Sequence, residues 1–171
     1  MLVEQELCRK LVDIFRSAMP PKVDVEGNWL PSEDGGFKGE PDVDGSVLKV
    51  RVSQRGYTSY TNKVAEFKVE LEGTIRVEDD TDMSGTFVCC GKLLTILSGW
   101  QDDIAAVKRD LSVPPPSSAE GVGTTSAETS CRKAFDPVGY LLGTDGDLDI
   151  EDNTLTRKYN QSFTIKGRIS K

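Results

Sequence analysis

The acidic run that starts at Asp145 is the pattern in this chain that most resembles a metal site. It reads DGDLDIE, and its alternating carboxylates resemble the start of a calcium loop, because Ca²⁺ takes several carboxylate oxygens at once. The rest of the EF-hand pattern is absent, since Ile150 stands where the loop needs glycine and Thr156 where it needs glutamate. We therefore interpret residues 144–153 as a solvated acidic turn, with weak Ca²⁺ binding as the alternative, and we predict no metal site.

Catalytic chemistry is difficult to build from this composition. The chain has no histidine, so the Ser–His–Asp and Cys–His arrangements are absent. It also lacks the phosphate-binding patterns G-x-x-x-x-G-K-[S/T] and G-x-G-x-x-G. A pair of carboxylates could act as acid and base, but 28 acidic residues make such pairs common by chance. We predict no catalytic residue and no cofactor, and an enzyme stays the third alternative for function.

The four cysteines do not form a metal-binding pattern. They are Cys8, Cys89, Cys90 and Cys131, with no C-x-x-C pair among them. Without histidine a mixed Cys/His zinc site is excluded, and the spacing does not suit a four-cysteine site. We expect buried free thiols in a protein that stays in a reducing compartment.

Length and charge restrict the class of protein. At 171 residues the chain suits a single domain over residues 1–171. Its net charge of −7 makes it a poor candidate for wrapping nucleic acid, because affinity for phosphate depends on Lys and Arg. Like charge would instead let nucleic acid pass without adhering. Acids interrupt the apolar residues of MLVEQELCRKLVDIF at the N-terminus, and no apolar run approaches the ~18 residues of a membrane span. We expect neither a signal peptide nor contact with a membrane.

Two long stretches alternate between apolar and polar residues, as strands with one buried face do. The first, KVAEFKVELEGTIRVED from Lys63, predicts a strand over 64–78 with a bulge or bend at Gly73. The second, RKYNQSFTIKGRIS, predicts the last strand of the chain. The stretch SVLKVRVSQ predicts a further strand over 46–54, and residues 55–62 are expected to join it to the first long strand as a hairpin with a wide tip.

Two amphipathic helices are predicted beside these strands, and both have apolar residues at three-to-four spacing. The first helix ends before Pro20, and its apolar stripe consists of Val3, Leu7, Leu11, Ile14 and Phe15. The second helix ends at Gly99, and its apolar face consists of Phe87, Cys90, Leu94 and Leu97, widened by Val88, Leu93 and Ile96. Residues 102–111 add one or two further helical turns. The pattern indicates an α+β domain in which a mostly antiparallel sheet carries two amphipathic helices on one face.

Long loops supply the candidate interface residues. Residues 31–45 form a loop rich in glycine, proline and acidic residues. Residues 112–133 are rich in proline and small polar residues, and we expect them to be an extended arm. The interface candidates are Arg55, Tyr57 and Tyr60 at the hairpin tip, and Trp29. The two tyrosines either anchor a partner or fold back onto the sheet. For Trp29, local packing is the preferred interpretation.

The order of these elements resembles that of the small tail-terminator and tail-completion proteins of long-tailed bacteriophages and prophages. The order is an amphipathic helix, a loop, a long hairpin, a second helix and a final strand of the form YNQSFTIKGRI. The resemblance covers most of the chain except the arm at 112–133, which is longer than the family leads us to expect and would mark an added clasp onto a neighbouring subunit. That family has no active-site motif to carry over.

The resemblance implies a structural protein of the virion tail, assembled in the host cytoplasm. It implies a homo-oligomeric ring, usually a hexamer, that sits on the end of the tail tube, stops tube polymerisation and provides the surface that joins the head. Its partners would be the tail-tube protein and the neck or head-completion proteins, and DNA would pass through the hole without specific binding. Two alternatives remain open: another neck, head-completion or tail-tube component, or a monomeric, non-catalytic bacterial binding module.

Overall fold

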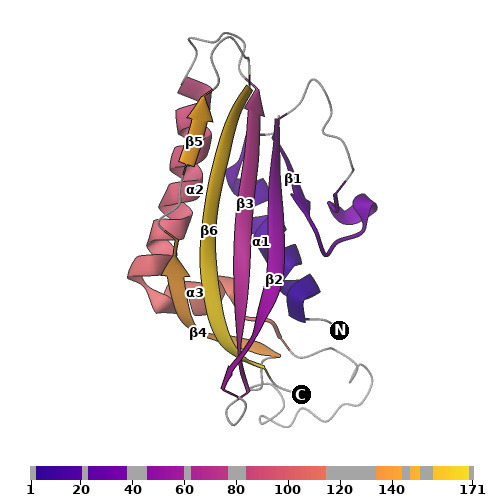
Figure 1. The fold of residues 1–171 in the computed structure, drawn as a ribbon, viewed down its shortest axis with the longest axis vertical. Coiled ribbons are helices and arrows are strands. Elements are labelled where there is room, and N and C mark those ends of the chain that lie inside the picture. The colour runs from indigo at the N-terminus through magenta and orange to yellow at the C-terminus, as the bar shows by residue number, and fades with distance from the viewer. Residues whose placement is uncertain are drawn as a thin grey trace.

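The structure is a mixed sheet with helices on one of its faces (Figure 1). This computed structural model describes residues 3–20, 23–37, 46–59, 63–76, 84–114, 134–143, 147–150 and 156–169. The helices are α1 (Val3–Ala18), η1 (a 3-10 helix, Ser32–Asp34), α2 (Ser84–Asp102) and α3 (Ile104–Leu111). The strands are β1 (Val23–Gly27), β2 (Ser46–Ser59), β3 (Val64–Arg76), β4 (Phe135–Leu142), β5 (Asp147–Ile150) and β6 (Thr156–Ile169).

The sheet has the strand order β1-β2-β3-β6-β4, and β5 also pairs with β6. The pair β1 and β2 is parallel, and each of the other pairs is antiparallel. The predicted α+β class is therefore confirmed. The two long alternating stretches become β3 and β6, and these strands lie side by side in the centre of the sheet over their full length. The remaining strands are added to either side of this central pair.

The alternation along β3 separates a buried face of the sheet from an exposed one. Ala65, Phe67, Val69 and Leu71 are buried, whereas Glu70 and Glu72 between and beside them are exposed. Figure 1 shows α1, α2 and α3 behind the sheet, so the three helices cover the same face. Successive side chains of a strand point to opposite faces of the sheet. The alternation in the sequence therefore predicts correctly which residues of β3 are buried.

The hairpin of β2 and β3 differs from the expected one at its tip. Strand β2 continues as far as Ser59, so the connection is shorter than predicted. The expected bulge at Gly73 is wrong, because the register past Gly73 is regular on both sides. The register shifts instead between Gln54 and Gly56 and between Tyr57 and Ser59. Gly56 has a φ of 121°, a conformation that glycine adopts without strain, and it therefore accommodates the first of these bulges.

The helices confirm the predicted segments but not every predicted face. In α1 the expected stripe is confirmed at Leu7, Leu11 and Phe15, which are buried, while Val3 and Ile14 are half-buried. Cys8 and Val12 are buried as well and widen the stripe, and the helix ends at Ala18, before Pro20.

In α2 the expected face is only partly correct, since Leu93 and Leu97 are buried whereas Val88 and Leu94 are 50% and 48% exposed. Cys89 and Trp100 complete the buried face of α2, and neither was expected there. The helix also continues through Gly99 to Asp102.

Helix α3 confirms the extra helical turns expected over 102–111. Its contacts also predict that the stability of the fold depends on pH. Asp103 caps the helix by accepting a hydrogen bond from the Ala105 N–H at 3.0 Å. Near its end, the Asp110 carboxylate accepts hydrogen bonds from Arg109 Nε at 3.0 Å and from the buried Trp100 Nε1 at 2.9 Å. The Arg109 guanidinium, assisted by the Trp100 N–H, lowers the pKa of Asp110.

A lowered carboxyl pKa predicts that Asp110 stabilises the fold above the carboxyl pKa of the unfolded chain, about 3.9, and that this contribution disappears as the pH falls through the lower folded value. We expect the difference in unfolding free energy between the wild type and Asp110→Asn to be constant from pH 7 to pH 5 and to shrink below about pH 4. Urea denaturation at pH 7, 5, 4 and 3 measures this difference. A constant difference down to pH 3 would contradict the assignment.

The ends of the predicted arm are held together. The Val113 N–H donates to the Phe135 carbonyl oxygen at 3.0 Å, and the Phe135 N–H donates to the Val113 carbonyl oxygen at 3.2 Å. Both residues are buried. Val113 and Phe135, which border the predicted arm, therefore lie side by side, while residues 115–133 lie outside the described part.

Candidate functional site

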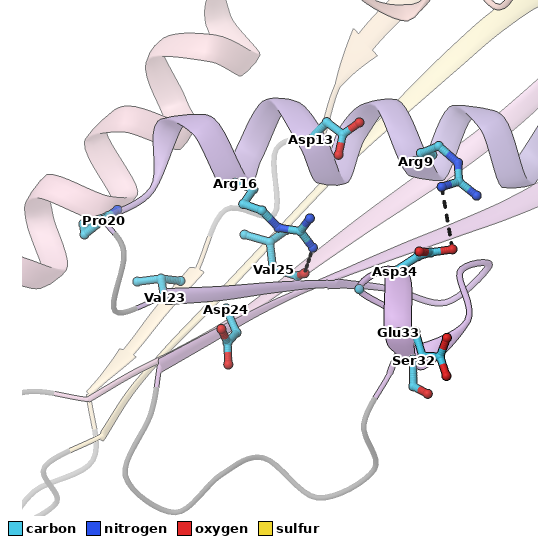
Figure 2. A pocket seen from close by; sticks show the side chains of 11 residues that line it. Arg9, Asp13, Arg16, Pro20, Val23, Asp24, Val25, Ser32, Glu33 and Asp34 are labelled. Carbon is cyan, nitrogen blue, oxygen red and sulfur yellow. Dashed lines mark hydrogen bonds and ion pairs between the residues drawn. The ribbon is translucent and has the colours of Figure 1, made fainter.

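A cleft of about 570 Å³ lies between α1, β1 and η1 (Figure 2). Its size falls within the ~300–1,000 Å³ that ligand-binding clefts usually have. Charged side chains dominate its lining. The residues are Arg9, Asp13, Arg16, Pro20, Val23, Asp24, Val25, Ser32, Glu33, Asp34 and Gly35.

The local sequence explains how three segments come together at this cleft. Arg9, Asp13 and Arg16 are spaced by four and three residues, so they share one side of α1. Helix α1 approaches β1 closely at Gly27, where a Cβ would lie 2.5 Å from Cys8 Sγ. Beyond β1 the chain turns back through η1, and Gly35 ends this turn with a φ of 100°, which favours glycine.

Some charged side chains of the cleft have a partner within it, and others have none among the described residues. Arg9 forms an ion pair of 3.9 Å with Asp34, and Arg16 Nη2 donates to the Val25 carbonyl oxygen at 3.2 Å, as Figure 2 shows. Within the described residues, no ion pair is formed by Asp13, Asp24 or Glu33. The cleft therefore carries an excess of negative charge beside the outer edge of β1, and it suits a cationic ligand.

The expected acidic turn is wrong over residues 147–150, and its other residues lie outside the described part. Residues 147–150 form β5, which pairs with β6 from Asp147 opposite Asn160 to Ile150 opposite Arg157. These residues are a strand rather than a turn, while Asp145 and Glu151 lie outside the described residues. In the described part of the chain no three acidic or cysteine side chains are grouped so that they could hold a metal ion. The Ca²⁺ alternative remains a prediction.

Three of the four cysteines are free thiols, and their environment does not activate them. Burial raises the pKa of Cys8 and Cys89. Burial, assisted by the neighbouring Cys89, raises the pKa of Cys90 to about 11. Because the thiolate is the reactive form, these three side chains are poor nucleophiles at neutral pH. Cys131 lies outside the described residues.

Three of the predicted interface residues, Trp29, Arg55 and Tyr57, belong to β2 or bond to it. Trp29 is 37% exposed, and its Nε1 donates to the Val52 carbonyl oxygen at 2.6 Å. Its indole therefore packs locally against β2, as the preferred interpretation had it. Arg55 and Tyr57 belong to β2 rather than to a loop, and Arg55 stands at the first bulge. Tyr60 lies outside the described residues, so the choice between its two interpretations stays open.

The face of the sheet that the helices do not cover is charged. Among the described residues, ion pairs cross or run along it between Arg51 and Glu72 at 3.7 Å, Lys68 and Glu70 at 3.0 Å, and Lys166 and Glu66 at 3.8 Å. Phe37 adds an aromatic ring that sequence reasoning missed, since its centroid lies 4.8 Å from the Arg51 guanidinium carbon and 5.5 Å from Lys49 Nζ. Within the described residues these pairs bring opposite charges together on this face, whereas Asp13, Asp24 and Glu33 at the cleft form no ion pair.

Comparisons with known proteins leave the resemblance untested. A scan against protein-family models and a search of curated proteins both found no match. Within the described residues, none of the helices is long and apolar enough to cross a membrane.

Proposed function

We propose that this protein forms a closed ring at the end of a bacteriophage tail tube, where it stops tube polymerisation and takes part in joining the tail to the head. The described elements follow the order that suggests this role: an amphipathic helix, a short strand, a long hairpin, further helices and a long final strand. The described residues also offer no metal-binding group, and the thiols among them are poor nucleophiles. A structural role agrees with both observations.

The observation that carries the proposal is a sheet with long central strands whose helices cover only one of its two faces. Helices bury one face, while the other face and the outer edge of β1 remain accessible in the described part of the chain. Accessible strand edges invite pairing with another chain, and natural proteins usually cover them. Identical copies arranged in a closed ring give every copy the same neighbours and can cover these surfaces.

The net charge of −7 agrees with a ring through which DNA passes. Several such copies around one hole produce a negative potential that repels the phosphate backbone. A ring of this kind guides DNA without binding it, whereas a DNA-binding protein needs a concentration of Lys and Arg.

Electron microscopy of particles assembled without this protein tests the proposal. We expect overlong tail tubes without heads, and restoration of normal tails when the wild-type chain is supplied. Normal tails joined to heads would contradict the proposal. Tubes of normal length without heads would indicate a neck or head-completion component, and the absence of tubes would indicate a tube component.

A further inference from the structure

Strand β4 ends the sheet on one side (Figure 1), and part of its outer edge is open. The Gly143 N–H donates to the Ser162 carbonyl oxygen at 2.8 Å and continues the antiparallel pairing of β4 with β6. Alternate residues of such a pair direct their N–H and C=O groups away from the partner strand, so Tyr140 and Leu142 direct theirs outward. The Leu142 N–H accordingly donates to Gln101 Oε1 at 2.8 Å. Within the described residues, the Tyr140 N–H and C=O have no hydrogen-bond partner.

Tyr140 is flanked by outward residues that have no free N–H. The outward N–H and C=O of Phe135 are bonded to Val113, and Pro137 has no N–H to donate. On the other side of Tyr140, the Leu142 N–H is already bonded to a side chain. A partner strand that needs a donor and an acceptor on the same residue therefore finds both at Tyr140.

The neighbours of Tyr140 form a projecting side chain and a groove on the face of the sheet that the helices do not cover. Leu141 projects and is 65% exposed. Gly139 has no side chain to fill the groove, and a Cβ there would lie 3.6 Å from Lys166 Cβ, an ordinary contact. Lys166 forms an ion pair with Glu66, so the groove suits an apolar occupant. The groove has a volume of about 310 Å³ and is lined by Glu66, Gly139, Tyr140, Leu141, Thr164 and Lys166.

We propose that β4 pairs antiparallel with β4 of a second copy of this chain, about a two-fold axis beside Tyr140. In such a pair the residue at the axis faces itself, and the residues one step before and after it face each other. Tyr140 of each copy would donate its N–H to the Tyr140 carbonyl oxygen of the other copy. Leu141 of each copy would lie opposite Gly139 of the other and would enter the groove. A second copy is the occupant because the same short stretch supplies both the groove and the leucine that fills it.

The contact is short, and one side chain has to move for it to form. The register shift between Pro137 and Gly139 interrupts the edge, so the contact is limited to a few residues around Tyr140. The Gln101 amide oxygen stands where a carbonyl oxygen of the second copy would accept from the Leu142 N–H. Gln101 is exposed and can turn away into solvent. It therefore covers part of the edge in a separate copy and gives up this place in the pair.

The pairing goes beyond the proposed ring and does not depend on it. A two-fold contact joins the same surface of two copies, whereas a ring at the end of a tube needs a head-to-tail contact. The pair is a form of the free chain before it joins a tail. In this form the open edge of β4 is covered and is protected from uncontrolled strand pairing.

Analytical ultracentrifugation of the full chain, without tube protein, measures the concentration at which half of the protein is dimeric. We expect Leu141→Ala to raise this concentration at least tenfold, because each dimer loses two buried leucine side chains. Gly139→Leu should raise it as much, since the added side chain fills the groove. The exchange Gly139→Leu/Leu141→Gly should restore the dimer, because leucine and glycine again lie opposite each other. Gln101→Ala should leave the dimer at least as stable as that of the wild type.

The matched control is Leu94→Ala, which makes the same change at an exposed leucine of α2 and should leave the dimer unchanged. Urea midpoints close to that of the wild type verify that each variant is folded. The pairing would be overturned, with the proposed ring still standing, by a wild type that forms no dimer up to about 1 mM, by a dimer that Leu141→Ala leaves intact, or by an exchange variant that stays monomeric. Leu141→Ala that keeps the dimer and loses only binding to a different protein would also overturn it. Normal tails from particles that lack this protein would overturn the ring and leave the pairing standing.

Discussion

Gly167→Ala is expected to destabilise the fold by about 2 kcal/mol, although a methyl group in the interior of a strand usually has the opposite effect. Gly167 lies in β6, and the ring of Phe135 occupies the space above it, so that an added Cβ would collide with this ring. The same Cβ would lie 2.9 Å from the Asp136 carbonyl oxygen, which belongs to the backbone of β4. The Phe135 ring packs against Phe67 edge to face at 5.3 Å, and it is also buried at the base of the predicted arm. Urea denaturation at pH 7 measures the change.

Gly73→Ala is the matched control, because Gly73 is also a buried glycine in a central strand. A Cβ there would lie 3.5 Å from Tyr159 Cβ, an ordinary contact. We expect its unfolding free energy to stay within about 1 kcal/mol of the wild type. In a Phe135→Ala background, Gly167→Ala should cost much less than in the wild type, since the colliding ring is gone. An equal cost in both backgrounds would show that the ring is not the cause.

Trp100→Ala is expected to lower the unfolding free energy by roughly 3–5 kcal/mol, the usual cost of removing a buried tryptophan or phenylalanine. Trp100 is 2% exposed and joins the helices to the sheet. Its ring centroid lies 5.9 Å from those of Tyr140 and Phe163 and 6.2 Å from that of Phe15. Truncation would leave a cavity among these rings and would remove the hydrogen bond to Asp110. Thermal unfolding and urea denaturation both measure the loss.

Trp29→Ala provides the comparison for the same chemical change on a partly exposed tryptophan. Its indole contributes one hydrogen bond to β2, so we expect a loss of about 1 kcal/mol. Trp100→Phe keeps most of the ring packing and should fall between the two alanine variants. Equal losses at Trp29 and Trp100 would contradict the burial that the structure assigns to them.

The sheet could be predicted from the sequence because its strands have one buried face. In β3 and β6 the apolar residues recur at every second position, and this period is specific to a strand. The pattern still missed two polar residues on the buried side of β6. Gln161 is buried and donates to the Gly143 carbonyl oxygen at 2.8 Å, and Arg157 is buried as well, with Nη1 donating to the Thr156 carbonyl oxygen. The sequence pattern did not assign these two residues to the core because their side chains are polar.

The buried face of α2 could not be predicted from its sequence, because the helix has apolar residues on several of its faces. Leu93 and Leu94 are adjacent and chemically identical, yet the first is buried and the second is 48% exposed. Only the packing of α2 against the sheet distinguishes them, and the period of 3.6 residues gives no preference when several faces are apolar. Gly99 likewise does not end the helix, and the next residue, Trp100, is buried.

The acidic cleft had no signal in the sequence. Arg9 and Asp34 are 25 positions apart, and they meet because β1 runs parallel to β2 and because η1 turns back towards α1. The alternation of Val23 and Val25 with acidic residues is typical of a short strand, but it indicates neither the partner strand nor its direction. Arg55 and Tyr57 are interface candidates by their residue types alone, and only the structure places them in β2.

The mass of the native full-length chain, measured at micromolar concentration alone and with tail-tube protein, tests the central claim most directly. A ring at the end of a tube requires that identical copies associate into one closed species of fixed stoichiometry. We predict a single assembly, a hexamer by the resemblance, in at least one of these two samples. A chain that remains a monomer in both would contradict the account.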